Sequence, residues 1–242
     1  MEIPTHTELT TIFPSFVMHK HWDMPEGFNE RLTELAIEDA LKNRITEEAG
    51  ERNIGDTSNH LGHLRHNFLT DCRAPEVAML TRMVDSAVRE YLMLAYGYQH
   101  EGEIRMMGDA LWQRRSHGEN IGVSTHTHLK ADIVVTYYPR VDLDGESENA
   151  LRRGGVRFYD PANVGKRFWP CNNPSYYTGG WFQVEPRVGS MTVFEGHIPH
   201  DSTFFEGEGR MCIPIMVDVD TPKKHCKVTT SDILSFQGQI SK

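Results

Sequence analysis

The sequence predicts an α+β protein that is mainly β, with helices ahead of a set of short strands. Apolar residues recur at helical spacing up to about residue 100, whereas from about Glu103 short apolar runs are broken by Gly, Pro, Asn and Asp. No strand is followed by a crossover helix, which disfavours a parallel α/β sheet. This order favours a double-stranded β-helix, the cupin-like jelly roll, with the N-terminal helices packed on one face.

Length and composition favour one domain. The chain has 242 residues, of which 38% are hydrophobic and 10% aromatic. This is enough for one large core, and barrels of this size are often undivided. We expect a helical cover over about residues 1–100, a β core over about 103–220 and a C-terminal tail over 221–242.

The charge and the cysteines limit the classes of partner and compartment. A net charge of −9 argues against nucleic acid or an acidic membrane as partner. No apolar run approaches the roughly 20 residues that cross a bilayer. The chain opens without a basic and apolar leader, which favours a cytoplasmic protein with free thiols. Its cysteines are widely spaced: Cys72, Cys171, Cys212 and Cys226. We expect a small molecule, amino acid or peptide as substrate, and the oligomeric state stays open.

The N-terminal part contains two amphipathic segments and a polar one. A short strand is predicted at Thr11–Val17, then a helix from about Pro25 to Gly50. A second helix is predicted from Pro75, where a missing amide hydrogen costs nothing, to Gly97. The polar stretch between them reads as a mobile loop, and its histidines are not assigned to a site. Those histidines are His60, His63 and His66.

Six short runs in the second half are predicted strands. They are Ala110–Arg114, Asp132–Tyr138, Gly155–Tyr159, Trp181–Val184, Ser190–Phe194 and Cys212–Val219. In a jelly roll, strand ends from distant parts of the sequence line one mouth of the barrel, where ligand sites are formed.

The most informative motif is the pair His126 and His128. Imidazole is the commonest metal ligand in proteins, and residues one apart on an extended segment project to the same face. Both side chains could therefore reach one ion. A third histidine from a distant strand would complete the set, and His197 and His200 are candidates.

Several motifs in this order resemble those of the 2-oxoglutarate and iron(II)-dependent oxygenases. The motifs are His126-Thr127-His128, Tyr137-Tyr138, the run from Gly154 to Pro161, the run from Val188 to Phe194, Ile198-Pro199-His200, and Arg210. The chain is most similar to a branch that uses His-x-His followed by a strand ending in Tyr-Tyr, and Ile12-Phe13-Pro14 also resembles the start of that branch. The resemblance covers the C-terminal half and this short N-terminal segment.

The resemblance implies a jelly-roll dioxygenase that uses Fe(II), 2-oxoglutarate and O2. Three protein groups hold the metal on one side and leave the other side open. His126, His128 and His200 would be these ligands. Arg210 would bind the far carboxylate of 2-oxoglutarate through its guanidinium fork. Tyr138 is a second candidate for binding the cosubstrate. The reaction would couple decarboxylation of 2-oxoglutarate to hydroxylation, or to a related oxidation, of a C–H bond.

The chain departs from the common pattern of this superfamily at His128, where most members carry an acid. Three neutral imidazoles leave the site more positive and suit other divalent metals as well. Asp132 is an alternative acidic ligand, but it would lie about 20 Å from His126 on an extended strand. His197 is kept as a partner that orients the site. Cys212 stands where the family often has serine.

Aromatic residues are expected to shape the pocket. Trp112 precedes the metal motif, Tyr138 follows it, and Trp181 lies on a later strand; core packing is an equal explanation for each. Segments 141–154 and 163–180 are candidate rim loops. The remaining histidines are expected to be solvated: His6, His19, His21, His100, His117 and His225.

Two other functions stay open from the sequence. A three-histidine cupin-type dioxygenase would bind metal without using 2-oxoglutarate, and Arg210 would then be dispensable. A non-catalytic jelly-roll module would use its histidines structurally or to bind zinc.

Overall fold

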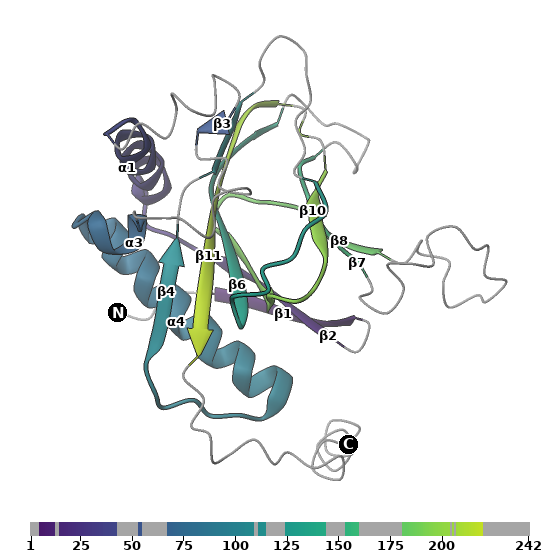
Figure 1. Ribbon diagram of the computed structural model, residues 1–242. Helices are drawn as coiled ribbons and strands as arrows, with labels where there is room; N and C mark the ends of the chain where they lie inside the picture. Colours follow the sequence, from purple (N-terminus) through teal and green to yellow (C-terminus); the bar gives the residue numbers. More distant parts are fainter. Residues whose placement is uncertain are drawn as a thin grey trace, which may run out of the picture.

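The structure is a computed structural model, shown in Figure 1. It describes residues 5–12, 15–42, 53–54, 67–108, 111–114, 124–143, 153–159, 181–203, 205 and 207–219. The helices of this part are α1 (Phe28–Lys42), α3 (Phe68–Asp71) and α4 (Pro75–Tyr96). The strands are β1 (Thr5–Ile12), β2 (Ser15–Trp22), β3 (Asn53–Ile54), β4 (Ile104–Gly108), β5 (Leu111–Arg114), β6 (Ile133–Leu143), β7 (Val156–Tyr159), β8 (Trp181–Val184), β9 (Ser190–Glu195), β10 (His200–Ser202) and β11 (Gly207–Val219).

Within these residues the strands form two sheets with antiparallel pairing. The larger sheet has the order β1-β2-β9-β6-β11-β5-β3, with β4 also paired to β11. The smaller sheet has the order β10-β7-β8. One cluster of buried side chains joins the two sheets, with Tyr138 and Phe194 from the larger and Phe158 from the smaller. The fold is a jelly roll, as the sequence predicts, and the interior lies between the sheets.

The other face of the larger sheet packs against the helices (Figure 1). Side chains alternate between the two faces of a strand, so each central strand contributes to both cores. On β6, Tyr137 faces the helices and Tyr138 faces the interior. On β11, Met211 and Ile213 face the helices while Cys212 faces the interior. Burial on both faces explains the apolar runs within these strands, such as Ile133–Val135 on β6 and Met211–Val217 on β11.

Helix α4 agrees with the sequence prediction in both bounds. Pro75 lies at its first turn, and Gly97 closes it in the left-handed conformation with φ 64°. The amide of Gly97 donates to the carbonyls of Leu92 and Met93 in the last turn of the helix. The helix buries a continuous stripe that includes Leu80 and Tyr91, and burial of each such side chain contributes about 1.5–3 kcal/mol.

The N-terminal part is less helical than the sequence predicts. The expected strand at Thr11–Val17 is wrong in its bounds, because it spans the end of β1 and the start of β2. These strands pair in register from Thr5 with Trp22 to Ile12 with Ser15, and β2 joins β9 of the larger sheet. Helical periodicity does not report this pairing, because β1 depends on β2, and β2 depends in turn on β9 far along the chain. Helix α1 begins at Phe28, and residues 43–50 lie outside the described part.

Several further expectations need correction. Asn53 and Ile54, placed in a loop from the sequence, form β3 and pair with β5. Strand β6 continues to Leu143, so the expected rim loop cannot begin at residue 141. His100 is 4% exposed rather than solvated, because its imidazole is hydrogen-bonded to Tyr98 and to a backbone carbonyl.

Some expectations lie outside the described residues. These are the histidines at 60, 63, 66, 117 and 225, the rim segment 163–180, the tail 221–242 and the cysteines at 171 and 226. Cys72 and Cys212 are free thiols, as expected. None of the described helices is long and apolar enough to cross a bilayer.

Candidate metal centre

His126 and His200 are brought together by the backbone. Each donates its amide hydrogen to the carbonyl of the other, at N to O distances of 2.9 and 3.0 Å. This antiparallel bridge adds the segment containing His126 to the edge of β10. Directly opposed residues project to the same side, so the two imidazoles become neighbours. The segment is not part of a continuous strand, which corrects the sequence-based picture of two histidines on one strand.

His128 is held by a second set of backbone hydrogen bonds. Its amide donates to the carbonyl of Gly196 at 2.8 Å, and the amide of Gly196 donates to Asp132 at 3.0 Å. A Cβ at position 196 would lie 2.2 Å from the carbonyl oxygen of Ala131 and 2.6 Å from that of His128. Only glycine permits this approach. Gly196 therefore helps to place His128 beside β10, and the sequence reading did not single it out.

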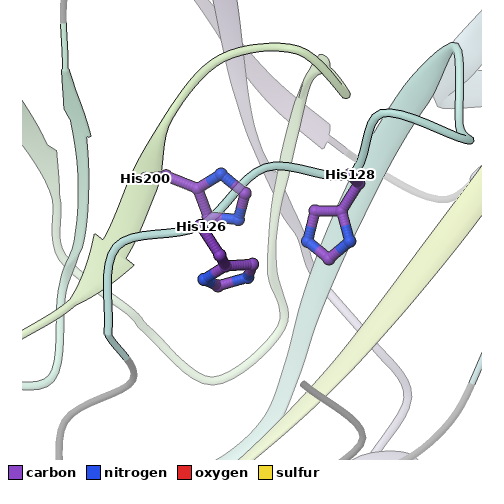
Figure 2. Close-up of side chains that lie close together, drawn as sticks. All are labelled: His126, His128 and His200. Atoms are coloured by element: carbon purple, nitrogen blue, oxygen red, sulfur yellow. The ribbon is translucent and has the colours of Figure 1, made fainter. Parts of the chain in front are cut away.

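The three imidazoles form one cluster, shown in Figure 2. Ring centroids are 4.4 Å apart for His126 and His200, 4.9 Å for His126 and His128, and 5.1 Å for His128 and His200. One ring nitrogen from each lies within 4.8 Å of the others, a spacing that a single ion could bridge. His128 and His200 are 9% and 6% exposed, so the cluster is largely shielded from water.

Hydrogen bonds orient two of the rings. Nδ1 of His126 lies 2.7 Å from the carbonyl oxygen of Ser124, and Nδ1 of His200 lies 2.9 Å from that of Ile198. A carbonyl oxygen only accepts, so Nδ1 carries the proton in both rings and donates it. Nε2 then keeps its lone pair. This arrangement is typical of metal-binding histidines, whose second nitrogen is fixed by a backbone or carboxylate oxygen.

Burial favours the neutral imidazoles that metals require. Desolvation, with a smaller effect of neighbouring His126, lowers the pKa of His128 to about 4. Desolvation and His126 likewise lower the pKa of His200 to about 3. At neutral pH both rings are uncharged, and a divalent cation would meet no competing proton.

Asp201 anchors this region from the opposite face of β10. Its carboxylate is 6% exposed and accepts two hydrogen bonds from Arg157, both at 2.8 Å. It also accepts from the hydroxyl of Tyr159 at 2.5 Å and from that of Thr125 at 3.3 Å. Asp201 follows His200 and Thr125 precedes His126. The carboxylate therefore ties both histidine-bearing backbones to β7, and the sequence reading did not identify it.

Arg210 lies in the interior, 2% exposed, on β11. Its Nη1 donates to the carbonyl of Gly154 and its Nη2 donates to the hydroxyl of Ser202 at 3.3 Å. Ser202 is two residues from His200 on β10, so both project to the same face. The guanidinium carbon lies 6.0 Å from the ring centre of Tyr138. The structure thus brings Arg210 and Tyr138 to the same side of β10 as the imidazole of His200.

Gly154 makes room for the guanidinium. It has φ +70°, and a Cβ there would lie 2.6 Å from Nη1 of Arg210. Cys212 is also buried near Tyr138 and Arg210, and burial raises the pKa of its thiol to about 11. The thiol is therefore neutral in this interior.

Other predicted residues are not brought into the cluster. Asp132 is exposed, and its carboxylate accepts the amide hydrogen of Val219 at 2.8 Å. His197 is exposed, and the ring of His200 is oriented by Ile198 instead. Trp181 lies half-buried on β8, and Trp112 lies on β5 with its side chain outside the described part.

No protein-family model matches the sequence, and no curated protein matches it significantly. Solved structures do resemble the chain. A non-heme alpha-ketoglutarate-dependent carbocyclase of nogalamycin biosynthesis, SnoK, has a TM-score of 0.49 at 12% identity, covering 83% of this chain and 78% of its own. A prolyl-4-hydroxylase of Pseudomonas putida has a TM-score of 0.46 at 12% identity, covering 84% of both chains.

An oxidoreductase of the 2OG-Fe(II) oxygenase family from Burkholderia pseudomallei has a TM-score of 0.38 at 11% identity. The match covers 61% of this chain and 60% of that protein, less than two thirds of its length. These three solved structures are 11–12% identical to this chain, a distance at which only the fold is compared.

Proposed function

We propose that the protein is an Fe(II)- and 2-oxoglutarate-dependent dioxygenase that oxidises a C–H bond of a small molecule, amino acid or peptide. The observation that carries this proposal is the convergence of three imidazoles, with a buried arginine on the side of β10 to which His200 projects. The sequence motifs that resemble the oxygenase family supply the same residues in the same order.

The ligand set fits a divalent metal. Imidazole nitrogens suit iron, zinc, copper and nickel, and three of them leave coordination positions free. Nε2 of His126 and of His200 is available in the tautomer that the carbonyls impose. Iron is the metal that the family resemblance implies. When bound with 2-oxoglutarate and O2, it would supply oxidative decarboxylation coupled to oxidation of the substrate.

The protein's own groups bind, orient and exclude water. His126, His128 and His200 would hold the metal, and Arg210 would bind the carboxylate of 2-oxoglutarate that is remote from it. A guanidinium has five N–H donors, so it can bind a carboxylate while it keeps its bonds to Gly154 and Ser202. Tyr138 packs beside Arg210 and keeps this part of the interior apolar.

The decisive experiment measures succinate and oxygen consumption in protein loaded anaerobically with Fe(II), with and without 2-oxoglutarate. The proposal expects succinate that requires both iron and 2-oxoglutarate. Arg210→Lys should reduce this turnover strongly, since lysine cannot form two parallel hydrogen bonds. Arg140→Lys, on an exposed part of β6, is the matched control and should not.

A three-histidine dioxygenase that does not use 2-oxoglutarate is the second candidate, and the lack of a carboxylate in the described metal cluster favours it. It predicts oxygen uptake without 2-oxoglutarate and an Arg210→Lys variant with normal activity. Metal binding without oxygen uptake under either condition would instead support a non-catalytic module. Either result would reject the proposed function.

A further inference from the structure

A cavity of about 630 Å³ is lined in part by His128, whereas His126 and His200 are not among its lining residues. Segment 127–131 forms one wall, and β4 with the C-terminal part of β11 forms the other. Its volume lies in the range of about 300–1,000 Å³ that holds small organic ligands. His128 belongs both to this cavity and to the metal cluster, so a ligand in the cavity would lie next to the candidate metal.

The larger sheet presents its interior face to this cavity. Ile215, Val217 and Val219 of β11 pack against the helices, so Met216 and Asp218 point to the opposite face. This is the face that carries Arg210 and Cys212 further along the same strand. Strand β4 lies beside β11 (Figure 1) and continues the wall. The candidate cosubstrate site and the cavity are therefore at different positions along one sheet face.

The wall has an apolar part made of flexible side chains. Met107 of β4 is directly opposite Met216 of β11, and Leu129 of the facing segment is 79% exposed. Met107 is itself 39% exposed. Thioether side chains are polarizable and adapt their shape to different apolar ligands. Exposure of large apolar residues around a cavity indicates a surface that a ligand covers.

The charged part of the wall has one cation in excess. Arg105 is directly opposite Asp218 across β4 and β11, where opposite charges attract and offset each other. Lys130 on the facing segment is exposed and has no carboxylate partner among the described residues. The chain as a whole carries a net charge of −9 and repels anions. Lys130 therefore gives the cavity a local positive charge that favours anions, although the chain as a whole repels them.

We propose that this cavity binds the primary substrate, and that the substrate is a small organic anion with an apolar body. Met107, Met216 and Leu129 contact the apolar body, and Lys130 attracts the anionic group. The assignment of this ligand as substrate rests on the proposed oxygenase function, whereas binding in the cavity does not.

The test uses octanoate, octylammonium and 1-octanol as probes that share one alkyl chain and differ in charge. Methionine methyl NMR of the full-length, metal-free protein reports where each probe binds, with resonances assigned by single Met→Leu variants. We expect octanoate to shift the methyl resonances of Met107 and Met216. Met93, exposed on α4 of the helical layer, should not respond. Octanoate should bind more tightly than the other two probes.

Charge reversal supplies the control. Lys130→Glu and Lys42→Glu both lower the net charge by the same amount, but Lys42 lies on α1, away from the cavity lining. Lys130→Glu should weaken octanoate binding by up to about fivefold, the upper end for an exposed charge pair, whereas Lys42→Glu should not. Met107→Glu should also reduce octanoate binding. Met107 is 39% exposed, so the variant should stay folded, which circular dichroism checks.

Unmoved Met107 and Met216 resonances, or equal affinities for the three probes with no effect of Lys130→Glu, would overturn the proposal. The outcomes separate from those of the oxygenase assay, because the titration requires neither metal nor turnover. Octanoate binding in the cavity without succinate formation in the oxygenase assay would reject the proposed function but support the ligand site in the cavity. Succinate formation without any shift of the Met107 and Met216 resonances would support the proposed function but reject the ligand site in the cavity.

Discussion

Replacement of Asp201 by asparagine should destabilise the protein and weaken metal binding by the three-histidine cluster. The amide keeps the size of the carboxylate but loses its charge, and its NH2 group would face the donors of Arg157. Loss of one partner of a buried ion pair costs about 3–5 kcal/mol. The side chain of Asp201 is 8% exposed but that of Arg157 is 27% exposed, so water recovers part of the loss. We therefore expect about 2–3 kcal/mol.

For a chain of this length, this loss corresponds to a decrease in Tm of about 4–12 °C. Thermal unfolding followed by circular dichroism measures it. Metal affinity, measured by competition with a chelator, should also fall about tenfold, because Asp201 fixes the backbone on which His126 and His200 lie. Thr125→Val, which removes only the link to the segment of His126, should weaken metal binding with a smaller change in Tm.

Glu34→Gln is the control for charge removal alone. Glu34 pairs with Arg31 on the surface of α1, and 62% of its side chain is exposed. Its removal should leave both Tm and metal affinity unchanged. If Asp201→Asn behaves in the same way as this control, the carboxylate does not hold the two backbones together and the reasoning is refuted.

Three further predictions concern the interior. Gly154→Ala should weaken 2-oxoglutarate binding about as much as Arg210→Gln, because a Cβ at position 154 would displace the guanidinium of Arg210. Calorimetric titration measures the affinity of both variants. Normal affinity in Gly154→Ala would contradict the close contact between Gly154 and Arg210. His200→Ala should abolish stoichiometric metal binding in elemental analysis, whereas His197→Ala, on an exposed residue, should retain it. The metal-free protein should lose stability as the pH falls from about 6.5 toward 4, because the folded-state pKa values of His128 and His200 are lowered and the unfolded chain takes up protons first. Urea unfolding at pH 7.5 and pH 5 tests this, and the dependence should shrink in His200→Ala.

The sequence allowed the fold class and the main residue types of the site to be predicted. Helix α4 is an example, since Pro75 and Gly97 specify its ends by local backbone chemistry. The short apolar runs predicted strands β5, β7, β8 and β9 to within one residue of their bounds, whereas β6 extends five residues beyond the predicted run. These features depend on neighbours within a few residues, so they can be recognised without knowledge of the tertiary structure.

The cluster of three histidines could be predicted only in part from local sequence patterns. The pairing of His126 with His128 followed from spacing, but their convergence does not come from one regular strand. It comes from backbone bonds to His200 and to Gly196, about 70 residues away in sequence. No local pattern reports such a contact, because its register is set by the packing of the two sheets.

The sequence by itself predicted the jelly-roll fold, and it singled out three histidines and an arginine as candidates to bind a metal and a carboxylate. Only the tertiary structure decided that Asp132 stays outside the cluster and that Asp201 anchors it. The cavity beside His128 is likewise seen only in the tertiary structure, since Met107 and Met216 become neighbours through the pairing of β4 with β11. Side-chain identity is local, whereas proximity between distant segments arises when sheets pair and pack.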